Sequence, residues 1–105
     1  MKFTIDEYLS QLPLRANEKW TEGVWDIETF EKKGVKLVFF APRVADRQTY
    51  HDEDEFYFIA RGSGEIVVDG DRTKCEEGDA FYVPAKIEHR FENFSDDFAT
   101  WAVFF

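Results

Sequence analysis

From residue 24 onward, the sequence consists of short runs rich in β-branched and aromatic residues, separated by turn signals. Runs of this kind are typical of strands, and so many of them predict a nearly all-β chain. An Asp-Gly pair at Asp69-Gly70 adds a tight two-residue hairpin between residues 65–68 and 72–75. The expected strands cover residues 24–30, 35–41, 55–60, 65–68, 80–83 and 98–105.

The N-terminal residues follow a different pattern. Thr4 and Glu7 have the spacing of a capping box, and apolar residues then recur at helical intervals until Pro13. This predicts a short helix from about residue 5 to 11. We expect one domain, with residues 1–20 as a helix and extension and residues 24–105 as a β-barrel.

Short strands with many turns close as a sandwich or a barrel. The chain contains twelve Phe, four Tyr and three Trp residues, which suit a small barrel filled by large side chains. The predicted fold is therefore an all-β jelly-roll barrel, a double-stranded β-helix, with a short N-terminal helix.

Charge and cysteine content restrict the partners and the compartment. The formal net charge of -9 argues against nucleic acid or an anionic membrane as a partner. The first 20 residues lack the features of a secretory signal, and no later segment has transmembrane length. Cys75 is the only cysteine, so a cytoplasmic location is expected, with an inert thiol.

Both histidines of the chain have a candidate carboxylate partner. His51 and Glu55 lie four apart in an apparently extended segment, so that alternation places them on one face. If His89 reaches the same point from another strand, two imidazoles and a carboxylate surround it. This ligand set suits a divalent first-row metal with open coordination positions.

The same region resembles the single-domain cupins of the type-2 conserved barrel group. Cupins carry a glutamate that is followed, after six residues, by glycine, as at Glu55 and Gly62. Their second motif, Gly-x5-Pro-x-Gly-x2-His-x3-Asn, begins at Gly78 and ends at Asn93, and the whole resemblance covers roughly residues 48–93. The matching positions of this second motif are Gly78, Pro84, His89 and Asn93.

Two positions depart from the cupin pattern. Thr49 stands at the first of the two cupin histidines, and Lys86 replaces the glycine after the proline. The resemblance therefore implies three metal ligands, His51, Glu55 and His89, with Thr49, Gln48 or water as a further contact. The ion would be Fe, Mn, Ni or Zn, and the sequence does not distinguish them.

The resemblance also implies a class of function. The leading hypothesis is a metal-dependent enzyme of dioxygenase, isomerase or lyase type that acts on a small organic molecule in the barrel. A non-enzymatic domain that binds or senses a metabolite or metal is the alternative, and a structural barrel with an empty site is the third reading.

The alternation of side chains along the expected strands suggests further site residues. Glu53 is a candidate extra ligand or general base, although a solvated acidic loop at 52–54 explains it too. Tyr57, Phe91 and Trp101 are candidates for the pocket wall, with core packing as the alternative. The acidic run favours a neutral or cationic ligand over an anion.

The ends of the chain suggest a homodimer. The aromatic run 101–105 and the N-terminal helix offer apolar surface that a second copy could cover. Burial of both segments within one chain is the alternative.

Overall fold

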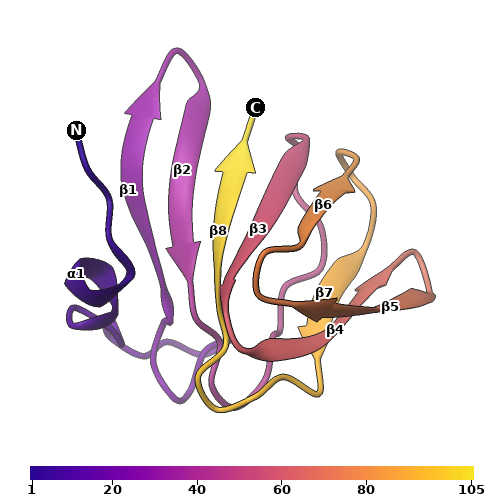
Figure 1. Cartoon of the computed structure of the whole chain (residues 1–105), viewed down its shortest axis with the longest axis horizontal. Helices are drawn as coiled ribbons and strands as arrows, with labels where there is room; N and C mark the ends of the chain where they lie inside the picture. The colour runs from indigo at the N-terminus through magenta and orange to yellow at the C-terminus, as the bar shows by residue number, and fades with distance from the viewer.

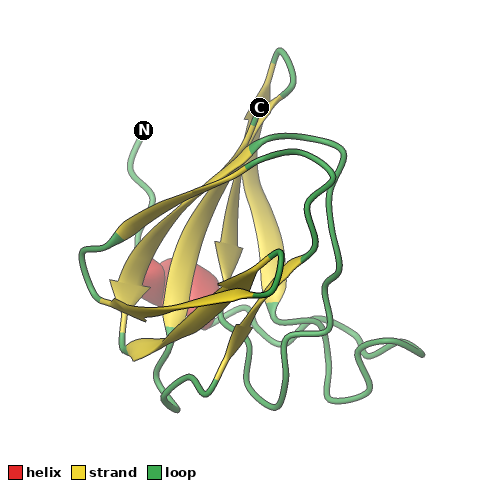
Figure 2. Ribbon diagram, turned by 90° about the vertical axis from the view of Figure 1, so that its right-hand side faces the viewer, coloured by secondary structure: helices red, strands yellow, loops and turns green.

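The computed structural model describes residues 1–105 and shows a jelly-roll barrel made of two antiparallel sheets (Figures 1 and 2). The strand order is β1-β2-β8-β3-β6 in the larger sheet and β5-β4-β7 in the smaller sheet. The elements are α1 (Ile5–Leu9), β1 (Asp26–Lys32), β2 (Val35–Phe40), β3 (Glu55–Arg61), β4 (Ser63–Val68), β5 (Asp71–Glu76), β6 (Ala80–Val83), β7 (His89–Glu92) and β8 (Ala99–Phe104).

The predicted Asp-Gly hairpin joins β4 to β5. Asp69 and Gly70 both have positive φ angles, of 50° and 83°, and Val68 pairs with Asp71 across the turn. Two consecutive left-handed residues match the right-handed twist of the flanking strands, which explains the preference for Asp-Gly at this position.

The structure corrects the expected elements in three places. The helix ends at Leu9 rather than near residue 11. Gly64 lies outside the expected strand 65–68 but within β4, where an added Cβ would come within 2.9 Å of the Phe94 side chain, so the close packing requires glycine. Strand β7 was not predicted, because its sequence His-Arg-Phe-Glu contains one apolar residue.

Alternation along the strands divides the apolar residues between two clusters. The main core lies between the two sheets and includes Tyr57 and Ile59 of the larger sheet and Phe91 of the smaller sheet. The face of the larger sheet that points away from this core carries Phe39, Ala41 and Ala99, against which the side chains of α1 pack. The interior between the two sheets therefore holds the residues that can form a site.

Helix α1 and the C-terminal strand cover each other within the chain. The Trp101 ring lies 6.0 Å from the Tyr8 ring and 5.0 Å from the Phe39 ring, measured between centroids. These are the apolar surfaces from which a homodimer was inferred, so that argument is weakened. A homodimer stays a prediction that a measurement of size in solution would test.

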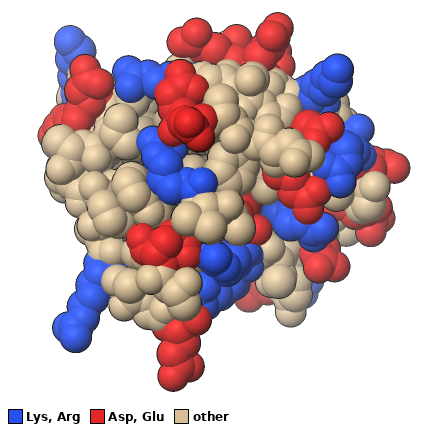
Figure 3. Space-filling model, turned by 90° about the horizontal axis from the view of Figure 1, so that it is seen from below, with Lys and Arg blue, Asp and Glu red and all other residues tan.

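The outer surface carries charges of both signs. Basic and acidic side chains are interspersed at the lower end of the barrel, and Figure 3 shows no continuous basic area on that face. The only helix has five residues and is far too short to cross a bilayer. The expectation that nucleic acid is not a partner stays a prediction.

Candidate metal centre

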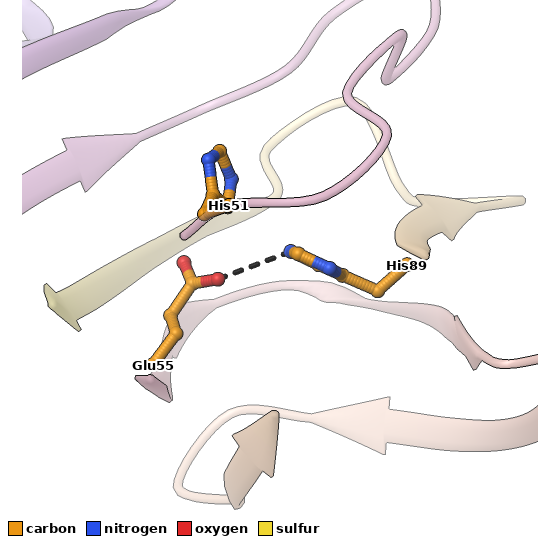
Figure 4. Close-up of side chains that lie close together, drawn as sticks. All are labelled: His51, Glu55 and His89. Atoms are coloured by element: carbon orange, nitrogen blue, oxygen red, sulfur yellow. Dashed lines mark ion pairs between the residues drawn. The ribbon is translucent and has the colours of Figure 1, made fainter. Parts of the chain in front are cut away.

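The three predicted ligands meet in the interior of the barrel. His51 comes from the loop before β3, Glu55 begins β3, and His89 begins β7. One potential ligand atom from each side chain lies within 4.8 Å of the other two. In Figure 4 the Glu55 carboxylate and the His89 ring point toward each other, with the His51 ring beside them.

Backbone hydrogen bonds bring the two histidines together. The Lys86 N–H donates to the His51 carbonyl oxygen at 2.6 Å, and the His89 N–H donates to the Thr49 carbonyl oxygen at 2.8 Å. Lys86 has a φ angle of 63°, a conformation that favours glycine, which accounts for glycine at this position in cupins. His51 is in a loop, so this pairing places it, rather than the strand alternation that the sequence suggested.

The ring of His89 is oriented by a hydrogen bond to the backbone, with its other nitrogen toward Glu55 and Tyr57. Its Nδ1 lies 2.8 Å from the carbonyl oxygen of Ile87, which can only accept, so Nδ1 carries the proton in the neutral ring. The unprotonated Nε2 then faces Glu55 Oε1 at 3.0 Å. Metal-binding histidines commonly donate their second N–H to a backbone carbonyl in this way.

The Glu55 carboxylate is almost completely buried and poorly satisfied. The residue is 1% exposed, and Oε1 has no hydrogen-bond donor, since His89 Nε2 at 3.0 Å carries no proton in the neutral ring. A buried carboxylate without a donor is costly. Either a proton on His89 or a cation between the two groups would remove the conflict.

A network of hydrogen bonds fixes the other side of the site. The Gln48 side-chain oxygen lies 2.9 Å from His51 Nε2 and 3.2 Å from the Tyr57 hydroxyl. The Gln48 amide nitrogen donates to the buried Asp46 carboxylate at 2.6 Å, which fixes the orientation of the amide. His51 Nε2 then donates to Gln48 in the neutral ring, and Nδ1 is left with a free lone pair.

Burial and charge shift the pKa values of these groups in opposite directions. Burial lowers the pKa of His51 despite the neighbouring Glu55 carboxylate. For His89, burial alone would lower the pKa, but the contacts with Glu55 and the Ile87 carbonyl raise it. Burial raises the pKa of Asp46 to about 6, although three N–H groups donate to its carboxylate.

The three ligands adjoin a cavity of about 260 Å³. His51 and Glu55 line it directly, and the His89 ring contacts the lining residue Tyr57 through the hydroxyl at 3.1 Å. Most of the wall is apolar and comes from inward-facing residues of the larger sheet. The lining residues are Lys19, Trp20, Asp26, Val38, Phe40, Gln48, His51, Glu55, Tyr57, Ala102 and Phe104.

Of the other predicted site residues, some line the cavity and some lie outside it. Gln48 and Tyr57 line the cavity, whereas the Thr49 side chain is exposed and only its backbone contacts the site. Glu53 lies outside the cavity, where its carboxylate is 3.8 Å from the Lys36 amine.

Two predicted wall residues are absent from the cavity. Phe91 is 1% exposed and packs in the main core, with its ring 4.7 Å from that of Tyr57. Trp101 points to the helix side of the sheet, because its strand neighbour Ala102 is the residue that faces the cavity.

Several residues of the site were not found from the sequence. Lys19 and Trp20 lie in the segment between α1 and β1, for which no element was predicted. Asp46 follows Val44 and Ala45 without a motif that marks it. Only the alternation of β2 and β8 could have identified Phe40 and Phe104 as inward-facing wall residues.

The distances agree with binding of one ion after a small adjustment. Two ligand atoms about 2.1 Å from a metal are about 3.0 Å apart at a right angle and about 4.2 Å apart on opposite sides. The distance of 3.0 Å between Glu55 Oε1 and His89 Nε2 fits the first case. The three ligand atoms all lie within 4.8 Å of one another, which is about 0.6 Å more than the distance between ligands on opposite sides of an ion. Rotation of a side chain supplies a shift of this size.

Comparison with known proteins places the barrel in a family. The cupin domain family matches residues 36–105. An uncharacterised protein of Streptomyces coelicolor is 37% identical over 104 residues, which cover 97% of this chain and 92% of that protein. The similarity to this relative therefore includes the N-terminal segment that lies outside the family match.

Solved structures share the fold at low sequence identity. KdgF from a Halomonas species is 18% identical, with a TM-score of 0.66, over 75% of this chain and 74% of that chain. The DMSP lyase DddQ from Ruegeria pomeroyi is 17% identical, with a TM-score of 0.60, over 70% of this chain and 39% of that chain. At these identities the comparison establishes the fold alone.

Proposed function

The chain belongs to the cupin family, and from this premise we propose that it binds one divalent transition metal through His51, Glu55 and His89 and acts on a small organic molecule in the adjoining cavity. The observation that supports the proposal most strongly is the buried Glu55 carboxylate, whose Oε1 lacks a donor and faces Nε2 of His89 at 3.0 Å. Two lone pairs directed at each other in a buried site favour a positive charge between them, which either a proton on His89 or a metal cation supplies.

The arrangement supports catalysis better than a purely structural role for the ion. Three protein ligands leave coordination positions free, and these adjoin the cavity. When bound, the ion would supply Lewis-acid or oxygen chemistry, in the dioxygenase, isomerase or lyase range. Fe, Mn, Ni and Zn all suit two imidazoles and a carboxylate.

The protein's own residues would orient the ligands and exclude water. The Ile87 carbonyl fixes the His89 ring, while Gln48 fixes the His51 ring. The Tyr57 hydroxyl lies within hydrogen-bonding distance of both Gln48 and His89. Because burial raises the pKa of Tyr57 well above its usual value, the hydroxyl stays protonated and can act as a donor beside the reacting molecule.

A binding or sensing domain that uses the same pocket is the second candidate. It shares the metal site and the cavity and differs only in lacking turnover. The solved DMSP lyase shows that a protein of this fold can be an enzyme, and this supports the first candidate by analogy of fold. Turnover by the metal-loaded protein divides the two candidates.

Metal titration of chelator-stripped protein tests the proposed site. Zn²⁺ and Mn²⁺ are titrated separately into the wild type, His89→Ala and Asp52→Ala. Asp52 is exposed, next to His51, and absent from the ligand group, so it serves as a matched control. We expect binding of about one ion per chain by the wild type and the control, and a loss of at least about 100-fold in affinity for His89→Ala. Equal binding by His89→Ala and the wild type would refute the ligand assignment.

A further inference from the structure

A segment from outside the family match forms part of the cavity wall. Residues 36–105 match the cupin family, whereas Lys19, Trp20 and Asp26 precede that region and still line the cavity. The cupin motifs therefore do not determine these three contacts. A side chain in this segment is able to select a substrate without altering the metal ligands.

The segment before β1 is anchored, and the anchors fix Trp20. Leu14 and Val24 exchange two backbone hydrogen bonds, of 2.7 and 3.1 Å. The Asn17 side-chain oxygen accepts from the Trp20 N–H at 2.7 Å, and the Trp20 ring packs against Phe40 at 6.5 Å between centroids. Trp20 is thus a fixed part of the wall, and Lys19 is attached directly to it.

Lys19 is a cation without an acidic partner. No carboxylate lies within 4.0 Å of its amine, as for every lysine of the chain except Lys36. Lys19 is exposed at the mouth of the cavity that it lines, and its amine lies 5.9 Å from the centre of the Trp20 ring. The amine is therefore available to a group bound in the cavity.

The charges of the cavity then favour a single anionic group. Among the residues that line the cavity, the carboxylates of Asp26 and Glu55 oppose Lys19, and a bound divalent ion adds two positive charges, which leaves an excess of one at the wall. Apart from the metal site and Gln48, the remaining wall is mainly apolar, with Trp20 and Phe104 among its aromatic residues. One negative charge on an apolar body complements this environment. The acidic run 52–54 suggested a neutral or cationic ligand, but Glu53 is paired with Lys36 outside the cavity.

We propose that the substrate is a small monocarboxylate with an apolar or aromatic body, and that Lys19 binds its carboxylate and determines the preference for acids. This inference rests on the proposed metal-dependent function, since the ion supplies the excess of positive charge. The cavity of about 260 Å³ limits the ligand to the size of a benzoate or a short fatty acid.

Binding of matched acids and amides tests the role of Lys19. The probes are benzoate, benzamide, hexanoate, hexanamide and inorganic phosphate, titrated calorimetrically into zinc-loaded protein. The variants are Lys19→Met, which removes the charge, Lys19→Arg, which keeps it, and Lys32→Met as a control at an exposed lysine of β1. Zinc content is measured in every sample first, so that failure of the metal site is recognised separately.

We expect at least one of the two acids to bind more tightly than its amide to the wild type. Lys19→Met should weaken binding of the acid by about 10- to 100-fold, as loss of a hydrogen bond to a charged group implies, with little effect on the amide. Lys19→Arg and Lys32→Met should retain most of the affinity. This pattern would support the proposal.

Three results would overturn it: saturable binding of neither acid, equal effects of Lys19→Met and Lys32→Met, or tighter binding of phosphate than of both acids. A protein that takes up no zinc would refute the proposed function instead. The same titrations of the zinc-free protein would then report on Lys19 alone, and an unchanged acid affinity in Lys19→Met would exclude its role there as well.

Discussion

Replacing Glu55 with glutamine should raise the stability of the metal-free protein while abolishing metal binding. The carboxylate is 1% exposed, and its Oε1 faces the unprotonated Nε2 of His89 at 3.0 Å. Glutamine has the same shape and places an N–H donor at this position, so a hydrogen bond replaces two opposed lone pairs.

The size of the gain follows from the cost of an unsatisfied buried group. That cost is about 1–3 kcal/mol, and 1 kcal/mol corresponds to about 4–8 °C in the melting midpoint of a domain of this size. With metal present the wild type should be the more stable of the two proteins. A metal ion at 100 times its dissociation constant stabilises the wild type by about 2.7 kcal/mol, whereas Glu55→Gln binds no ion and gains nothing.

The gain should also depend on pH. The pKa of His89 is raised above 6.5, so in the folded wild type its protonated ring pairs with Glu55 at low pH. The stabilisation by this ion pair is complete at pH values below the pKa of His89 in the unfolded chain, and it is lost as the pH rises through the pKa of His89 in the folded protein. The advantage of Glu55→Gln should therefore be larger at pH 8.5 than at pH 5.5.

Urea and thermal unfolding in the presence of a chelator, at both pH values, measure the effect. Glu53→Gln is the matched control, since Glu53 is partly exposed and pairs with Lys36, and its substitution should change stability by less than about 0.5 kcal/mol. A Glu55→Gln variant that is less stable than the metal-free wild type at pH 8.5, or that still gains stability from Zn²⁺, would refute the reasoning.

Three further predictions concern the barrel itself. Phe39 is fully buried between α1 and the sheet, so Phe39→Ala should lower the free energy of unfolding by about 3–5 kcal/mol in urea titrations. The control Phe58→Ala, at a position that is 45% exposed, should lower it by less than about 1 kcal/mol. Equal losses in the two variants would contradict the assigned faces of the sheet. Because the pKa of Asp46 is raised from 3.8 to about 6, the folded protein keeps this carboxyl protonated at pH values where the unfolded chain has lost the proton. Ionisation of Asp46 should therefore lower the free energy of unfolding by about 3 kcal/mol as the pH rises from 3.8 to 7. Asp46→Asn should remove that slope in unfolding measurements across the same range, and an unchanged slope would exclude the effect. Cys75 is 3% exposed, and burial raises its pKa from 9.0 to about 11, so its reaction with a thiol reagent should be at least about 100-fold slower in the folded protein than in urea; a similar rate in both states would show that the thiol is accessible.

Much of the fold follows from local signals. The Asp-Gly pair at Asp69-Gly70 specified the hairpin, and runs of β-branched and aromatic residues located most of the strands. Strand β7 was missed because its two buried positions are His89 and Phe91, and histidine carries no strand signal. Tertiary burial, which no local pattern reports, makes this segment a strand.

The site was predictable only where a motif spans it. The spacing of Glu55 and His89 within the cupin pattern identified two candidate ligands, and His51 followed from the register; the structure brings all three together. The wall was less predictable, because Lys19 and Trp20 reach the cavity through anchoring contacts of a loop. Trp101 was placed wrongly because the face of β8 that borders the cavity depends on its pairing with β2, in which Trp101 opposes Phe39.

The metal content of the native protein tests the central claim most directly. Protein purified without chelators is examined by elemental analysis, next to His89→Ala prepared in parallel. We predict about one equivalent of a first-row transition metal per wild-type chain, and less than about a tenth of an equivalent in the variant. A wild-type protein with less than about a tenth of an equivalent of any such metal would contradict the account.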